Sequence, residues 1–153
     1  MPHAVSTFLE QIEQKSWDGQ LFDLHSGHVL FARRPDPTEP NFDNTAKEET
    51  STIMFAEYNE DYPHEKYTIG FPIRHDAGQK FYINLQDNVV RHSPRFENDA
   101  VTGEDRLIEG EPCFGKIKDQ HSRMVVDEMN KLRFGNDGIL EDKVEIVSAR
   151  LIG

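Results

Sequence analysis

Histidine and acidic side chains are the residues of this chain that could perform acid–base or metal chemistry. The chain contains seven histidines. His25 and His28 are three residues apart in a segment with strand composition, where successive side chains alternate between faces. The sequence has no His-Glu-x-x-His pattern and no paired cysteines of the kind that bind zinc. We therefore expect no metal and no cofactor, and we expect His28 to border a groove.

Cys113 is the single candidate for a sulfur nucleophile. It lies between Pro112 and Phe114 in a predicted strand, and a buried cysteine behaves as a small hydrophobic residue. We therefore favour a structural role for its thiol. A single cysteine also excludes an intramolecular disulfide, so the sequence does not indicate a compartment.

Two helices and several strands must position these residues. Apolar residues at i, i+3, i+4 and i+7 predict a helix over residues 3–15 (Val5, Phe8, Leu9 and Ile12), and a second apolar stripe predicts a helix over residues 122–133 (Met124, Val125, Met129 and Leu132). Branched and aromatic runs predict strands at residues 21–24, 27–32, 52–56, 67–71, 80–85, 113–117 and 144–152. The pattern indicates a mainly β fold with two helices.

Length and charge limit the classes of function. A chain of 153 residues predicts one domain over residues 1–153, with long polar surface loops at residues 33–51 and 94–110. The formal net charge of −11 makes binding to nucleic acid or anionic membranes improbable. The apolar runs are shorter than the ~20 residues of a membrane span, so we expect no membrane insertion in this segment.

Five segments, in this order, resemble the cyclophilin-type peptidyl-prolyl cis-trans isomerase domain. After the first helix, residues 17–29 are similar to the family stretch YDGxxFHRV and the first catalytic strand, and residues 67–71 and 81–84 are similar to the next two strands, the latter matching QFFI. Residues 110–129 are similar to the VFGKV…GMDVVDxI signature, and residues 144–146 to the closing strand.

The resemblance implies an eight-stranded antiparallel β-barrel capped by two helices, with a prolyl-peptide groove on its outer face. The family has two strands before its first helix, whereas this chain begins almost at that helix. We therefore expect a barrel that is incomplete on its N-terminal side. The closing strand near residues 144–152 should then lie at an exposed edge or pair with a segment that is not its usual family neighbour.

The resemblance also locates the catalytic positions. Prolyl isomerisation has a barrier of ~18–20 kcal/mol from amide resonance, and the family lowers it with an arginine that donates to the proline nitrogen. That position is Leu24 here, and the family glutamine falls on Phe31. We considered Arg33 and Arg34 as substitutes, but solvated loop arginines are the simpler interpretation.

Other positions of the family groove retain less polar character. The family histidine matches Glu111, the alanine-asparagine pair matches Pro72 and Ile73, and the pocket aromatics are Tyr82 and Phe114. We expect these last two to form a shallow apolar pocket. The full set of peptide-groove candidates is His28, Val29, Phe31, Pro72, Ile73, Tyr82, Glu111 and Phe114.

Three hypotheses follow from these observations. The first is a cyclophilin-like domain that binds protein or proline-containing peptide, alone or as a subunit of a larger assembly, with weak or no catalysis. The second is an active prolyl isomerase that assists protein folding. The third is a β-rich binding domain unrelated to cyclophilins.

Overall fold

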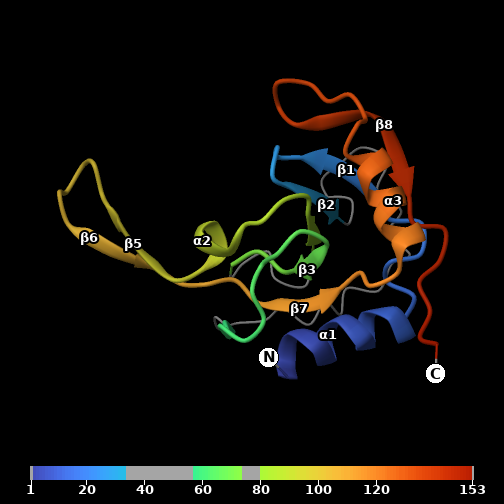
Figure 1. Ribbon diagram of the computed structural model, residues 1–153, viewed down its shortest axis with the longest axis horizontal. Helices are drawn as coiled ribbons and strands as arrows, with labels where there is room; N and C mark the ends of the chain where they lie inside the picture. Colours follow the sequence, from blue (N-terminus) through green and yellow to red (C-terminus); the bar gives the residue numbers. More distant parts are fainter. Residues whose placement is uncertain (1, 34–56, 74–79, 153) are drawn as a thin grey trace.

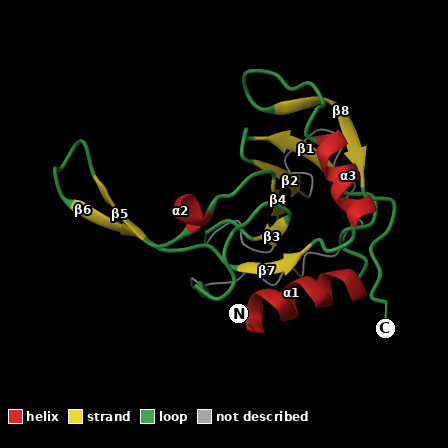
Figure 2. Cartoon of the chain, viewed as in Figure 1, coloured by secondary structure: helices red, strands yellow, loops and turns green. Residues whose placement is uncertain are grey.

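The fold is seen in a computed structural model that describes residues 2–33, 57–73 and 80–152. The described part contains three helices and eight strands (Figures 1 and 2). The helices are α1 (Pro2–Glu13), α2 (Val89–His92) and α3 (Gln120–Met129). The strands are β1 (Leu21–His25), β2 (Val29–Arg33), β3 (Thr68–Gly70), β4 (Lys80–Asn84), β5 (Arg95–Asn98), β6 (Asp105–Ile108), β7 (Cys113–Lys116) and β8 (Ile139–Glu145).

Six strands form one antiparallel sheet in the order β7-β3-β4-β2-β1-β8. β7 and β8 are its edges, and no strand of the described part joins them into a closed barrel. The prediction of a mainly β, antiparallel fold with incomplete closure is confirmed. The closing strand does lie at an edge, but it spans residues 139–145 rather than 144–152.

The first helix forms as predicted, but its buried face differs from the expected one. Val5 and Leu9 are 38% and 39% exposed, whereas Ala4, Thr7 and Gln11 are buried. Burial of the Gln11 amide is possible because its Oε1 accepts a hydrogen bond of 3.1 Å from the indole of buried Trp17. Phe8 and Ile12 still pack against the core.

An aromatic cluster fills the core between α1 and the sheet. The Phe8 ring lies 4.8 Å from Phe114 and 5.3 Å from Phe81, between ring centroids. Trp17 meets Phe81 edge-on at 4.6 Å, and Phe71 lies 4.4 Å from Phe114. Contacts at these separations stabilise a core beyond the area they bury, so this cluster holds α1 on the sheet.

The second predicted helix, α3, begins at residue 120 and ends at 129. Asp119 caps it, because its carboxylate accepts from the Ser122 N–H at 2.8 Å. Val126 and Met129 are its buried residues, whereas Met124 and Val125 are 58% and 46% exposed. The expected apolar stripe is therefore only partly buried.

The expected loop at residues 94–110 contains the two-stranded hairpin β5–β6, which extends away from the main sheet (Figure 1). Phe96 and Leu107 are cross-strand neighbours in it and are 73% and 53% exposed. Asp99 organises the tip of this hairpin, because its carboxylate accepts hydrogen bonds from the Val101 and Thr102 N–H groups. The sequence also did not predict α2, a single turn before this hairpin.

Two predicted segments lie outside the described residues. These are the strand at residues 52–56 and all but the first residue of the loop at residues 33–51. Within the described residues, none of the helices has the length and apolar character needed to cross a membrane.

Candidate functional site

One face of the central strands carries a set of polar and aromatic side chains. Val29 pairs with Asn84, Phe31 with Tyr82 and Arg33 with Lys80 in the β2–β4 ladder. Side chains alternate along each strand, so these residues share a face, while Leu30, Ala32, Phe81 and Ile83 point into the core. The face opposite the aromatic core is therefore the candidate site.

Tyr82 lies at the centre of this face and is fully buried (0% exposed). Its hydroxyl donates a short hydrogen bond to the Glu111 carboxylate. Burial raises the pKa of Tyr82 well above its ordinary value, and the adjacent Glu111 charge raises it further. The phenol therefore stays protonated and acts as a hydrogen-bond donor.

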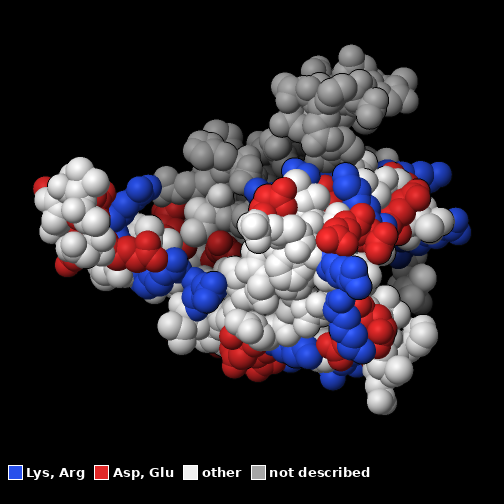
Figure 3. Space-filling model, turned by 90° about the horizontal axis from the view of Figure 1, so that it is seen from above, with Lys and Arg blue, Asp and Glu red and all other residues white. Residues whose placement is uncertain are grey.

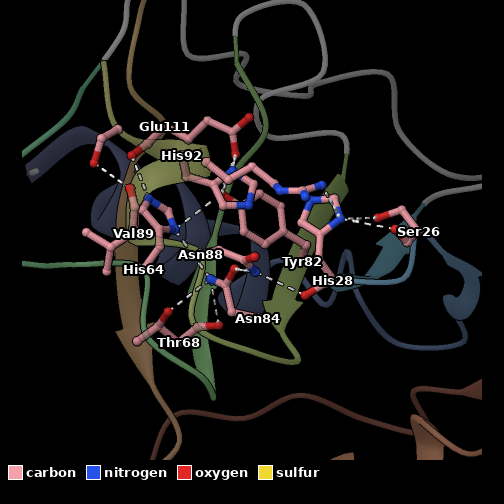
Figure 4. A network of polar contacts seen from close by, with 12 residues as sticks. Ser26, His28, His64, Thr68, Tyr82, Asn84, Asn88, Val89, His92 and Glu111 are labelled. Atoms are coloured by element: carbon pink, nitrogen blue, oxygen red, sulfur yellow. Dashed lines mark hydrogen bonds and ion pairs between the residues drawn. The ribbon is translucent and has the colours of Figure 1, made fainter. Parts of the chain in front are cut away.

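Glu111 also binds His92, whose Nδ1 lies 2.6 Å from the carboxylate. A carboxylate only accepts hydrogen bonds, so Nδ1 carries the proton. His92 Nε2 is buried and has no hydrogen-bond partner in the described part of the chain. Tyr82, Glu111 and His92 thus form a connected triad on the face of the sheet opposite the aromatic core (Figure 4).

His64 connects this triad to the backbone. Its Nε2 lies 2.9 Å from the carbonyl oxygen of Glu111, and its ring centroid is 4.9 Å from that of His92. Burial lowers the pKa of both His64 and His28, and in each case a backbone hydrogen bond opposes this shift without cancelling it. Both pKa values lie below the ordinary value of 6.5.

An amide network extends the site toward β2. The Asn84 amide donates to the Thr68 hydroxyl at 2.9 Å, and the Asn88 amide donates to Asn84 Oδ1 at 2.7 Å and to the His28 carbonyl at 3.0 Å (Figure 4). Because these buried groups satisfy one another, they fix the position of the segment that carries His64 and His92.

Gly70 makes room for the central tyrosine. A Cβ built on Gly70 would lie 2.7 Å from the Tyr82 hydroxyl oxygen and 2.9 Å from the Pro112 carbonyl oxygen. No side chain fits at these distances, so β3 can pass beneath the phenol only with glycine at this position.

The expected apolar pocket between Tyr82 and Phe114 is not formed by these two residues. In the β3–β7 pairing Ile69 meets Gly115 and Gly70 meets Cys113, so Phe114 is the extra residue of a β-bulge. Phe114 packs into the α1 core, while Tyr82 faces the other way. The sequence could not show a bulge that re-aims one aromatic ring.

The remaining candidates are distributed over the same face and its border. Phe31 is half-buried, and its ring meets Tyr82 at 5.6 Å. His28 is half-buried at the end of the network, and Val29 is buried. Pro72 and Ile73 are half-buried where the chain leaves β3.

The two positions that the resemblance makes catalytic are direct neighbours. Leu24 pairs with Phe31 across the β1–β2 ladder, so neither side of this pair offers a hydrogen-bond donor. Arg33 lies two residues further along β2, and its Nε is 2.8 Å from both carboxylate oxygens of Asp23. Arg34 lies outside the described residues.

Sequence reasoning missed His64, Thr68, Asn84, Asn88 and His92 as members of the site. Thr68 lies in β3, Asn84 in β4 and His92 in α2, whereas His64 and Asn88 lie in the loops before β3 and α2. No local pattern connects them. In the described part of the chain, no group of three or more His, Cys, Asp or Glu side chains could hold a metal ion. Burial raises the pKa of the Cys113 thiol, which does not favour a nucleophilic role.

Comparisons with known proteins agree on one family. The family model for "Cyclophilin type peptidyl-prolyl cis-trans isomerase/CLD" matches residues 1–151. Two crystal structures of a Cryptosporidium parvum cyclophilin-type peptidyl-prolyl cis-trans isomerase, one in the presence of the dipeptide Ala-Pro, have TM-scores of 0.62. Their sequences are 13% and 14% identical to this chain. Each match covers 96% of this chain, and 83% and 82% of the two crystal-structure chains respectively. No curated protein sequence matches the chain.

Proposed function

Because the chain belongs to the cyclophilin-type peptidyl-prolyl cis-trans isomerase family, we propose that it binds a proline-containing segment of another protein with little prolyl isomerase activity. Family membership overturns the hypothesis of an unrelated β-rich domain. The observation that carries the proposal is the Leu24–Phe31 pair, which has no donor at the two positions where the family catalyses isomerisation.

The catalytic argument follows from the reaction itself. A prolyl isomerase must bind the twisted amide more tightly than the planar one, and a donor to the proline nitrogen does so. Loss of one preorganised donor commonly lowers the rate on the order of 10²–10³-fold. Leu24 and Phe31 supply no such donor, so we expect turnover to be reduced by at least this amount.

The binding argument rests on Phe31 and its surroundings. This aromatic ring is half-buried, and the ammonium group of Lys80 lies 5.6 Å from its centroid. Half-buried Pro72 and Ile73 add apolar surface near the end of β3, the other neighbour of β4. An apolar ring with a nearby cation suits a proline ring and an adjacent backbone carbonyl.

An assay of isomerisation without a coupling protease tests the catalytic part. The substrate is a tetrapeptide with an Ala-Pro bond, and the proteins are the unmodified chain and a Leu24→Arg, Phe31→Gln double variant. We expect no measurable turnover by the unmodified chain and a gain in the double variant. Leu107→Arg, on the exposed hairpin, is the control for adding an arginine. Turnover near that of an ordinary cyclophilin would overturn the proposal.

Binding is tested separately by titrating the same tetrapeptide and following backbone amide shifts. We expect perturbations centred on Phe31 and Tyr82, reduced in a Phe31→Ala variant. Shifts that map elsewhere, or none at all, would contradict binding at this face even if turnover is absent.

A second candidate, an active isomerase, is favoured by one observation. Arg33 is on the same face as Phe31, and its guanidinium is oriented by Asp23. If the unmodified chain shows turnover that Arg33→Lys removes, then Arg33 supplies the missing donor and the protein assists folding as an enzyme.

A further inference from the structure

Residues 133–135 cover the outer edge of β8 at Ile139 and Glu141, because the Gly135 N–H donates to the Ile139 carbonyl at 3.0 Å and the Glu141 N–H donates to the Arg133 carbonyl at 2.9 Å. Beyond Glu141, this edge has unpaired backbone groups in the described part of the chain. Ile146 donates to the Gln20 carbonyl at 2.8 Å and accepts from the Gly19 N–H at 2.7 Å, so it faces the segment that leads into β1. Alternation then turns the N–H and C=O groups of Lys143 and Glu145 away from β1. The structure gives these groups no partner among the residues it describes. An open edge of this kind can accept another strand.

The charges on this edge are self-complementary. In an antiparallel pair of two β8 strands centred on Val144, Lys143 lies opposite Glu145 of the second copy, and Glu145 lies opposite Lys143. Both side chains are exposed and make no ion pair with any described residue. A pairing centred on Lys143 or on Glu145 would instead place like charges opposite each other, which is destabilising. The charges therefore select one register.

An apolar groove lies beside the same edge. It has a volume of about 460 Å³ and is lined mainly by Met124, Val125, Met129, Leu132 and Val144. Met124 and Val125 are 58% and 46% exposed, so the groove is open to solvent. Figure 3, a view of the molecule from above Figure 1, shows an uncharged area with acidic and basic side chains around it.

We propose that two copies of this chain associate through β8, with Val144 on the two-fold axis. The N–H and C=O groups of Lys143 and Glu145 would form a short antiparallel ladder across the interface. Residues directly opposite at a non-hydrogen-bonded position lie about 4.5 Å apart between Cα atoms, so the two grooves would meet at Val144. This dimer would cover the part of the edge beyond Glu141, pair two lysines with two glutamates and bury the exposed face of α3. It does not rest on the proposed peptide binding.

Sedimentation equilibrium over a series of protein concentrations tests the dimer. Lys143→Glu and Glu145→Lys should each weaken association about tenfold or more, because two cross-strand pairs become repulsive. The double variant Lys143→Glu, Glu145→Lys makes the edge self-complementary again and should restore association. Lys118→Glu is the matched control for Lys143→Glu, because it changes the net charge by the same amount at an exposed position outside β8 and the groove.

Amide hydrogen exchange gives a readout at the interface itself. Exchange at Lys143 and Glu145 should slow as the protein concentration rises, whereas exchange in the β5–β6 hairpin should not change. A monomer at every concentration would overturn the proposal. Association that the single charge reversals leave unchanged, or that the double variant fails to restore, would overturn it as well.

Discussion

Replacing Tyr82 with phenylalanine tests whether the buried triad holds the candidate site together. The substitution keeps the ring, which is 0% exposed, and removes the hydroxyl that donates to the Glu111 carboxylate. A hydrogen bond to a charged group contributes about 1.5–3 kcal/mol. Since the Tyr82 hydroxyl is buried and the Glu111 side chain is only 17% exposed, we expect the free energy of unfolding to fall by about 2 kcal/mol.

Denaturant unfolding measures this loss. Trp17 is the only tryptophan and is 1% exposed, so its fluorescence reports unfolding of the core. With a urea dependence of about 2 kcal/mol per molar, a loss of about 2 kcal/mol lowers the midpoint by about 1 M. The slope of the transition should not change, because the substitution leaves the surface exposed on unfolding almost the same.

A double-mutant cycle separates the hydrogen bond from other effects of the substitution. Tyr82→Phe combined with Glu111→Gln should cost less than the two single changes added together, with a coupling free energy of about 1 kcal/mol or more. Tyr58→Phe is the control, because the Tyr58 hydroxyl lies 3.0 Å from a neutral partner, Ser93 Oγ. The reasoning is refuted if Tyr82→Phe costs less than Tyr58→Phe, or if the two changes add within about 0.5 kcal/mol.

Two further predictions concern pH and the backbone. Burial holds the pKa of His64 and His28 below 6.5. As the pH falls below about 6.5, these two histidines therefore bind protons more readily in the unfolded chain than in the folded one, and the stability that the neutral rings contribute is lost. Urea unfolding should give a lower stability at about pH 5.5 than at about pH 7.5, and a stability that is constant over this range would contradict the burial of these rings. Gly138 has a φ of +79°, and a Cβ there would lie 2.6 Å from the His25 carbonyl oxygen. Gly138→Ala should therefore lower the free energy of unfolding by about 3 kcal/mol. Gly103 has a φ of +72° but open space around it, so Gly103→Ala, the control, should lower it by only about 1 kcal/mol. Equal midpoints of the two variants in thermal unfolding would show that the backbone contact is unimportant.

Local patterns predicted the elements in which the spacing of apolar residues along the chain matches the face that is buried. The segments of β2, β4 and β7 were predicted because each is short and rich in branched and aromatic residues. Tyr82 was correctly placed in β4. The first helix was found from its apolar spacing, but its buried face was not. Gln11 could be recognised as buried only once Trp17 was known to donate to it.

The candidate site depends on contacts between distant segments, so the sequence predicted it only in part. Glu111 was identified as a groove position, but its partner His92 lies in α2, a helical turn that the sequence did not predict. Phe114 was expected beside Tyr82 and lies in the core, because a bulge in β7 adds one residue opposite β3. A one-residue change in register is invisible to a pattern that counts only residue types.

The pairing of β1 with β8 has a consequence for how the protein is made. Leu21 is opposite Glu145 in that ladder, so β1 finds this neighbour only after the chain has been synthesised as far as residue 145. During synthesis on the ribosome, β1 and β2 can form a hairpin early. The other edge of β1 stays unpaired until β8 has been translated. Contacts between positions so far apart in sequence also slow folding. The nascent chain therefore exposes this edge of β1 until residue 145 has been synthesised, and this is the stage at which a chaperone would have most to protect.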